Sequence, residues 1–177
     1  GRSGDAGTGN GDRPPGRWDV WCAAAGGPPE PVLTDVARAA LAAGVVFLPV
    51  WIDDLVIRTG PLTHPGDTAC LRCYLLRLDS TDPHREVHRL LRDTAGPPSP
   101  AGFLPSMAAV AAGIAATEVV KHLTGLPVTT CGRAVELTMV PFRAAVHRVL
   151  RVPRCPECSG TARRSAPIVA HGSPMGE

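Results

Sequence analysis

The hydrophobic positions at the start of the chain predict a strand, a helix and a second strand in close succession. Residues 18–25 are mostly apolar, and a Pro/Gly loop separates them from residues 30–43, where apolar side chains recur at helical spacing before Gly44. Residues 45–52 are apolar throughout, which is typical of a strand buried on both faces. Because short loops join the three elements, they predict a parallel pair of strands in the middle of an α/β sheet.

Beyond these elements the pattern predicts one long helix and several smaller pieces. The long helix, residues 104–123, has a middle made almost entirely of small residues and stops at Gly125. We place it in the core, because small side chains allow close approach. A closing β-hairpin is expected after it, with strands at 135–140 and 144–152. The remaining elements are expected as a short strand at 55–59, a helical turn at 74–78 and a polar helix at 83–92.

Composition and charge predict one domain with two polar ends. Residues 1–17 are largely Gly, Arg, Asp and Pro and are expected to form a disordered arm or linker, and residues 161–177 a flexible tail. The part between them, residues 18–160, is long enough to bury a core of its own. A net charge of +2 and an aromatic content of 4% argue against a nucleic-acid partner.

Three observations predict the compartment. The N-terminus is polar and lacks the features of a signal peptide. The longest apolar run, residues 103–117, is shorter than the roughly 20 residues that a membrane-spanning helix needs. Six cysteines, four of them in two closely spaced couples, suit a reducing environment better than a secreted disulfide scaffold. We therefore expect a cytoplasmic protein without a membrane span.

The two cysteine couples, Cys70 with Cys73 and Cys155 with Cys158, carry the clearest chemical signal. Each has the spacing Cys-x-x-Cys, which lets both sulfurs of a couple face inward from one tight turn. Four thiolates make a closed tetrahedral zinc site with no position for water or substrate. A zinc ion there would hold the chain together rather than catalyse a reaction. Disulfides or unpaired buried thiols are the alternatives.

Other cysteines and histidines have a structural as well as a functional interpretation, and the structural one is favoured. Cys131 can be a nucleophile or a small half-buried residue at the start of a strand, and Cys22 is expected in the core. His84 and His88 have a spacing that can hold a metal, but a solvated helix face also explains them. His64 is either a partner of the cysteine sulfurs or an exposed loop residue.

The charged residues are interpreted in the same way. Asp53 and Asp54 can form an acid–base pair, but a turn is favoured. Glu118 and Lys121 are expected to stabilise their helix as a pair three residues apart. Basic residues near the C-terminal end can attract an acidic peptide or simply aid solubility. These are Arg148, Arg151, Arg154, Arg163 and Arg164.

Three motifs accompany this order of elements. They are Gly60-Pro61 with Pro65-Gly66 before the first cysteine couple, Ala-Ala-Thr-Glu-Val-Val-Lys at 115–121, and Cys-Pro-Glu-Cys at 155–158. Together they resemble the C-terminal half of the ThiF/MoeB superfamily of adenylating enzymes, which is related to ubiquitin activators. The resemblance covers residues 18–160. It implies an α/β domain that is the distal half of a ThiF-like Rossmann-type fold, with a closing β-hairpin and a four-cysteine structural zinc site.

Within that superfamily, residues 48–50 and 58–62 suggest a divergent branch. The chain resembles the ThiF-like, leader-peptide-binding partner of a YcaO cyclodehydratase in thiazole/oxazole-modified microcin or thiopeptide biosynthesis. This resemblance implies a non-catalytic scaffold that presents a ribosomal precursor peptide to the cyclodehydratase, which uses ATP to form azolines. The implied partners are the YcaO-type cyclodehydratase and the precursor peptide, and a homodimer is also considered.

Two departures from the superfamily pattern argue against catalysis by this chain alone. No Gly-rich nucleotide loop lies between a strand and a helix, and an Ala/Gly/Pro loop at 23–29 replaces the acidic cluster of active members. We therefore assign no catalytic residue and no cofactor besides zinc. The alternative is an ATP-dependent adenylyltransferase of the ThiF/MoeB type, acting on a sulfur carrier or a peptide C-terminus, with its nucleotide-binding half missing from this chain.

Overall fold

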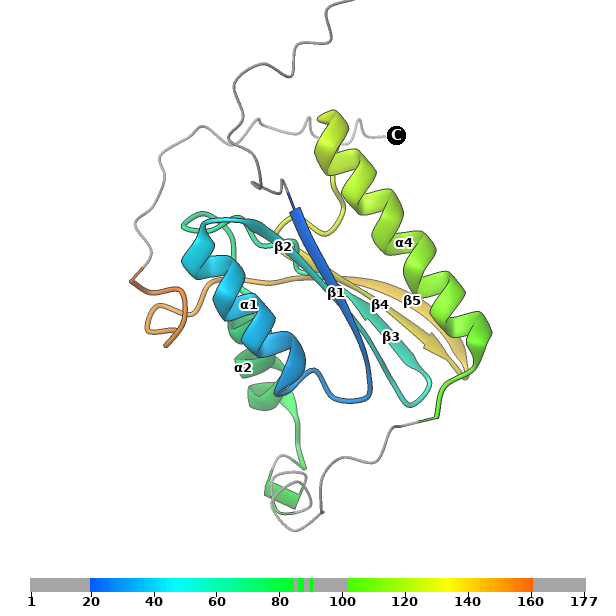
Figure 1. Ribbon diagram of the computed structural model, residues 1–177. Coiled ribbons are helices and arrows are strands. Elements are labelled where there is room, and N and C mark those ends of the chain that lie inside the picture. Colours follow the sequence, from blue (N-terminus) through cyan, green and yellow to red (C-terminus); the bar gives the residue numbers. More distant parts are fainter. Residues whose placement is uncertain (1–19, 85, 88–89, 91–101, 161–177) are drawn as a thin grey trace, which may run out of the picture.

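The computed structural model describes residues 20–84, 86–87, 90 and 102–160. Its centre is a five-stranded sheet in which every strand lies beside its neighbour in sequence (Figure 1). β1 (Val20–Gly26) and β2 (Val46–Asp53) are parallel and are connected by α1 (Val32–Ala43). The antiparallel strands that follow are β3 (Val56–Thr59), β4 (Arg133–Met139) and β5 (Phe142–Arg148). The predicted α/β class, parallel pair and closing hairpin are confirmed.

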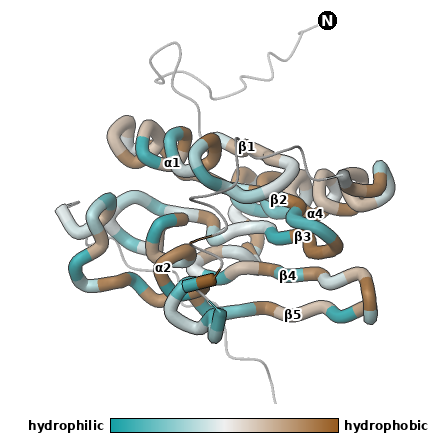
Figure 2. Tube along the Cα trace, turned by 90° about the horizontal axis from the view of Figure 1, so that it is seen from below, coloured by the Kyte–Doolittle hydropathy of each residue, from teal (hydrophilic) through white to brown (hydrophobic). Residues whose placement is uncertain are grey.

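Helices cover both faces of the sheet. Figure 2 shows α1 and α2 (Leu71–Thr81) on one side and α4 (Pro105–Thr124) on the other. Successive side chains of β2 point to opposite faces of the sheet and so contribute to a core on each face. On one face, Phe47 and Trp51 pack with α1 and α2. On the opposite face, Leu48 and Val50 pack in the cluster that contains the buried residues of α4. β2 is therefore covered on both sides, which explains why its sequence is a continuous apolar run.

The expectation that both parallel strands lie in the middle of the sheet is wrong for β1. Within the described part of the chain β1 pairs only with β2 and forms an edge. Cys22, which was expected in the core, is exposed. Cys22 is paired with Leu48, so its side chain lies on the same face of the sheet as α4. α4 does not cover this position, because β1 is at the edge of the sheet.

Both predicted glycine stops are confirmed. Gly44 (φ 67°) and Gly125 (φ 73°) adopt the left-handed conformation that ends α1 and α4. The prediction that α4 lies in the core is correct for one side of the helix only. Small residues occur all around its middle, but only the side that packs on the sheet is buried. Its buried residues are Met107, Ala111, Ala115 and Glu118.

Two predicted boundaries are corrected. The expected helical turn at 74–78 is the longer helix α2, which begins directly after Cys70 and so includes the first cysteine couple in its first turn. The hairpin turn lies at Val140 and Pro141 rather than at 141–143, because Met139 and Phe142 are already paired in the ladder. Half of the expected polar helix at 83–92 lies outside the described residues, as do the arm at 1–17 and the tail at 161–177. In the described ranges, no helix has the length and apolar character that crossing a membrane demands.

Candidate metal centre

Two different local structures bring the four cysteines together. Cys70 is the N-cap of α2 and Cys73 lies in its first turn, where the helix dipole favours a thiolate. Cys155 and Cys158 come from a turn-rich segment that follows β5, in which the N–H of Ser159 donates to the carbonyl of Cys155 at 3.1 Å. All four side chains are buried. The site therefore joins α2 to the segment at the end of the described domain.

The sulfur positions fit a tetrahedral metal ion. All four Sγ atoms lie within 4.8 Å of one another. Cys70 Sγ is 3.7 Å from both Cys73 Sγ and Cys155 Sγ, and Cys73 Sγ is 3.5 Å from Cys158 Sγ. Four ligands at about 2.3 Å from a zinc ion lie about 3.8 Å apart at the corners of a tetrahedron. All six cysteines are free, so the disulfide alternative is not seen.

The identity of the ion as zinc stays a prediction, which the four-thiolate donor set favours. Among the residues that the structure describes, no other group of three or more His, Cys, Asp or Glu side chains is close enough to share a metal. A fully coordinated ion would leave no open position for a substrate. The arrangement can therefore hold the fold together, and the chemistry of any reaction must lie elsewhere.

The thiols of this centre do not ionise alike. Cys70 donates a hydrogen bond to Cys73 Sγ, which lowers the pKa of Cys73 and raises the pKa of Cys70. Burial raises the pKa of Cys158. A thiolate at Cys73 thus opposes ionisation of its neighbours. A divalent cation removes that opposition, so metal binding is expected to release protons.

Arg151 connects the segments that carry the two cysteine couples, a role that the sequence did not reveal. Its guanidinium donates to the carbonyl of Gly66 at 2.7 Å and to the carbonyl of Cys158 at 2.8 Å. It thus joins the loop before the first couple to the second couple. Its neighbour Val152 donates its N–H to Cys73 Sγ at 3.3 Å. Such outer contacts orient metal ligands.

We expect Arg151→Ala to weaken metal binding about tenfold, because both carbonyls lose their shared donor. The free energy of unfolding should fall by about 1–3 kcal/mol. Competition with a chromogenic chelator and urea unfolding measure the two effects. Arg154→Ala is the matched control, since Arg154 is an exposed arginine three positions away. Equal metal loss in both variants would show that Arg151 has no such role.

His64 is neither an exposed loop residue nor seen against the sulfurs. Its ring packs edge-on against the ring of His122 in α4, with centroids 5.1 Å apart. Burial, reinforced by the neighbouring His122, lowers the pKa of His64. The backbone N–H of His64 donates to Thr68 Oγ1 at 2.8 Å, which shapes the loop that leads to Cys70. His64 therefore connects this loop to α4.

The favoured structural interpretation of Cys131 agrees with its surroundings. The residue is half-buried just before β4, and burial raises the pKa of its thiol. A neutral thiol is a poor nucleophile. A turn separates β2 from β3 as favoured, but Asp54, at φ 53°, and Leu55 form it. Asp53 is the last residue of β2 and pairs with Val56. Burial raises the pKa of Asp53, and the charge of Asp54 adds to the effect.

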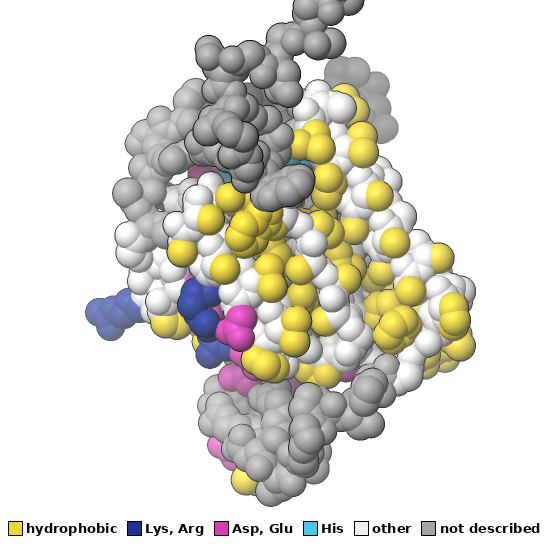
Figure 3. All heavy atoms as spheres, in the orientation of Figure 1, with side chains coloured by type: hydrophobic (Ala, Val, Ile, Leu, Met, Phe, Trp, Pro, Cys, Tyr) yellow, Lys and Arg dark blue, Asp and Glu magenta, His cyan; other side chains and the backbone are white. Residues whose placement is uncertain are grey.

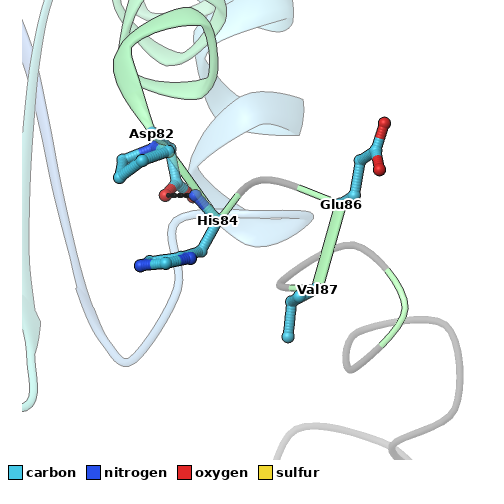
Figure 4. A pocket seen from close by; sticks show the side chains of 5 residues that line it. Asp82, His84, Glu86 and Val87 are labelled. Carbon is cyan, nitrogen blue, oxygen red and sulfur yellow. Dashed lines mark hydrogen bonds between the residues drawn. The ribbon is translucent and has the colours of Figure 1, made fainter.

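The residues that follow α2 form an open depression (Figure 4). The backbone N–H of His84 donates to Asp82 Oδ1 at 2.9 Å, which is a local turn contact. The labelled side chains do not converge on one point, so the depression has no evident ligand geometry. His88, the expected second histidine of a metal pair, lies outside the described residues. The lining residues are Asp82, Pro83, His84, Glu86 and Val87.

Glu118 forms the predicted pair with Lys121, at 2.7 Å, and an unexpected contact with a distant loop. Its carboxylate accepts hydrogen bonds from the backbone N–H of Thr130 at 2.7 Å and from the Thr130 hydroxyl at 2.9 Å. Both residues are buried. Glu118 therefore ties α4 to the loop that enters β4.

The carboxyl end of β1 lacks the features of a nucleotide site. In open parallel α/β sheets a ligand binds outside these strand ends. Here the ring of Phe103 lies so close to Gly26 that a Cβ at that position would collide with it. Gly27 is buried and donates its N–H to the carbonyl of Ile52 at 2.7 Å. Residues 20–29 contain no acidic side chain that could bind a metal–nucleotide complex.

No protein-family model matches this chain, and no curated protein matches its sequence. Its fold does match solved structures. One is a heterocyclase in complex with substrate and cofactor (TM-score 0.65, 23% identity), and another is the heterocyclase TruD (TM-score 0.64, 24% identity). A third is MccB of E. coli, in a structure with AMPCPP and MccA (TM-score 0.60, 20% identity).

Each of these matches covers 79% of this chain, which in turn spans 20% and 22% of the two heterocyclases and 39% of MccB. At such identities the likeness shows the fold alone. The neighbours are consistent with the ThiF-like fold that the sequence motifs imply. The activities of those longer proteins are not thereby transferred to this one.

Proposed function

We propose that this chain is a non-catalytic scaffold that presents a ribosomal precursor peptide to a YcaO-type azoline-forming cyclodehydratase. The observation that carries the proposal is a fold shared with two heterocyclases. In this chain, the carboxyl end of β1 has no acidic residue, and the ring of Phe103 lies against Gly26 there. The ATP chemistry would then belong to the partner. The metal centre would keep the recruiting domain folded without taking part in the reaction.

Reconstitution tests this proposal. The chain is mixed with a YcaO-type cyclodehydratase and precursor peptide from the same organism, and azolines are counted by the loss of one water per ring. Recruitment raises the local peptide concentration, so we expect azoline formation to be about tenfold faster with the chain than without it. The chain and the cyclodehydratase should also co-elute in size-exclusion chromatography. An unchanged rate together with separate elution would contradict the scaffold role.

An adenylyltransferase of the ThiF/MoeB type is the second candidate. It is favoured by the likeness to MccB, which has also been solved with ATP. It is favoured too by the free edge of β1, along which hydrophobic side chains gather between α1 and α4 (Figure 3). A nucleotide-binding half could extend the sheet at that edge. ATP–pyrophosphate exchange that depends on peptide would support this candidate, and exchange at background level supports the scaffold.

A further inference from the structure

β5 lies at the edge of the sheet opposite to β1 (Figure 2). In the ranges that the structure describes, its only partner is β4, and the ladder between them is unbroken from the pair Met139–Phe142 to the pair Arg133–Arg148. A regular edge strand presents a row of unpaired N–H and C=O groups to other chains. β5 is therefore a place where an additional strand can pair.

The hydrogen-bond pattern identifies which backbone groups of β5 are available. The N–H of Val149 donates to the carbonyl of Gly132 at 2.9 Å, and the N–H of Met139 donates to Leu55, away from β5. Because these directions alternate along an antiparallel ladder, the backbone groups of every second residue of β5 point away from β4. These are Phe142, Ala144, Val146 and Arg148.

The side chains of the same four residues form an uncovered, mainly apolar strip. They lie on the α4 side of the sheet, since Phe142 and Ala144 are paired with Met139 and Leu137, which pack in the α4 cluster. α4 packs on β1, β2 and β3 and leaves β5 outside its cover. Phe142 is 74% exposed and Val146 is 52% exposed. An added strand would bury part of this strip.

The positive charge around β5 favours an acidic binding partner. Arg148 lies directly opposite Arg133 in the ladder, a like-charge pair that costs stability unless an anion compensates it. No acidic residue occurs between positions 137 and 156, whereas Arg143 adds positive charge to β5 itself. Self-pairing of two β5 strands would bring these basic side chains together, which argues against a second copy as the occupant.

We propose that β5 binds an extended, acidic peptide segment as a sixth strand of the sheet. Main-chain hydrogen bonds to the free edge would give the affinity. Alternate apolar residues would pack on Phe142 and Val146, and carboxylates would reach Arg143 on one face and Arg148 at the end of the other. The natural segment would belong to the precursor peptide, and this identification alone rests on the proposed function.

A labelled eight-residue peptide of alternating valine and glutamate is the probe, and the matching valine–lysine peptide is its control. Fluorescence anisotropy should show binding of the acidic peptide at least about tenfold tighter than that of the basic one. In NMR hydrogen exchange, the outward amides of Ala144 and Val146 should slow about tenfold on binding. Equal binding of both peptides, no binding of either, or binding without slower exchange overturns the proposal.

Substitutions locate the site. Ala144→Pro removes an outward N–H but no ladder bond, and Arg143→Glu reverses the charge on the face where the glutamates of the probe lie, so each should weaken the acidic peptide about tenfold. Arg154→Glu is the matched charge control and should change affinity less than about twofold. Thermal unfolding checks that each variant is folded, and if Ala144→Pro is not, Arg143→Glu decides. Peptide binding is measured on this chain alone, so it can fail or succeed independently of azoline formation.

Discussion

Replacement of Cys158 by Ser is expected to remove most of the bound metal and most of the stability of the domain. The side chain is 2% exposed, and Cys73 Sγ lies 3.5 Å away in a segment 85 residues earlier. A structural zinc site contributes on the order of 10 kcal/mol of apparent binding free energy. An ordinary domain is stable by about 5–15 kcal/mol, so loss of the site should leave Cys158→Ser largely unfolded at 25 °C.

Elemental analysis and urea unfolding measure this outcome. The unmodified chain should contain about one zinc per molecule, and Cys158→Ser less than about a tenth of that. Cys22→Ser is the matched control, because the same atom is exchanged at an exposed position of β1. It should keep its metal and change the free energy of unfolding by less than about 0.5 kcal/mol. A metal-free and stable unmodified chain would contradict the zinc assignment.

Glu118→Ala should lower the free energy of unfolding by about 3 kcal/mol. The substitution leaves the N–H and the hydroxyl of Thr130 without their acceptor, and Thr130 is fully buried. Buried donors without a partner cost about 1–3 kcal/mol each, and the partly buried ion pair with Lys121 is lost as well. Equilibrium urea unfolding at pH 7 measures the loss. A decrease below about 0.5 kcal/mol would show that water replaces these contacts.

The same carboxylate should make stability depend on pH. Burial alone would raise the pKa of Glu118, but hydrogen bonds from Lys121 and Thr130 outweigh it and lower the pKa. A carboxyl group with a lowered pKa contributes stability above its unfolded pKa of about 4.3, and this is lost as the pH falls through the folded value. Glu118→Gln should therefore lose less stability in acid than the unmodified chain.

Local patterns predicted those elements whose environment is uniform along their length. β2 is apolar from Val46 to Ile52 because both of its faces are covered. Gly44 and Gly125 predicted the ends of α1 and α4, because the residue that ends such a helix adopts the left-handed conformation, which glycine allows without strain. The sequence pattern predicts too short a helix for α2. The helix begins at the first cysteine couple, Cys70 and Cys73, whose spacing indicates a metal-binding turn rather than the start of a helix.

By itself, the sequence determined that four cysteines form two couples, that the chain has an α/β order and that β1 ends without acidic residues. These are properties of spacing and residue type, which act over a few positions. The tertiary structure alone decided that Cys22 is exposed at an edge, that Glu118 holds Thr130, and that Arg151 joins Gly66 to Cys158. Each depends on which distant segments become neighbours, and side-chain alternation or spacing does not encode that. The free edge and basic character of β5 likewise followed only from the strand order and register.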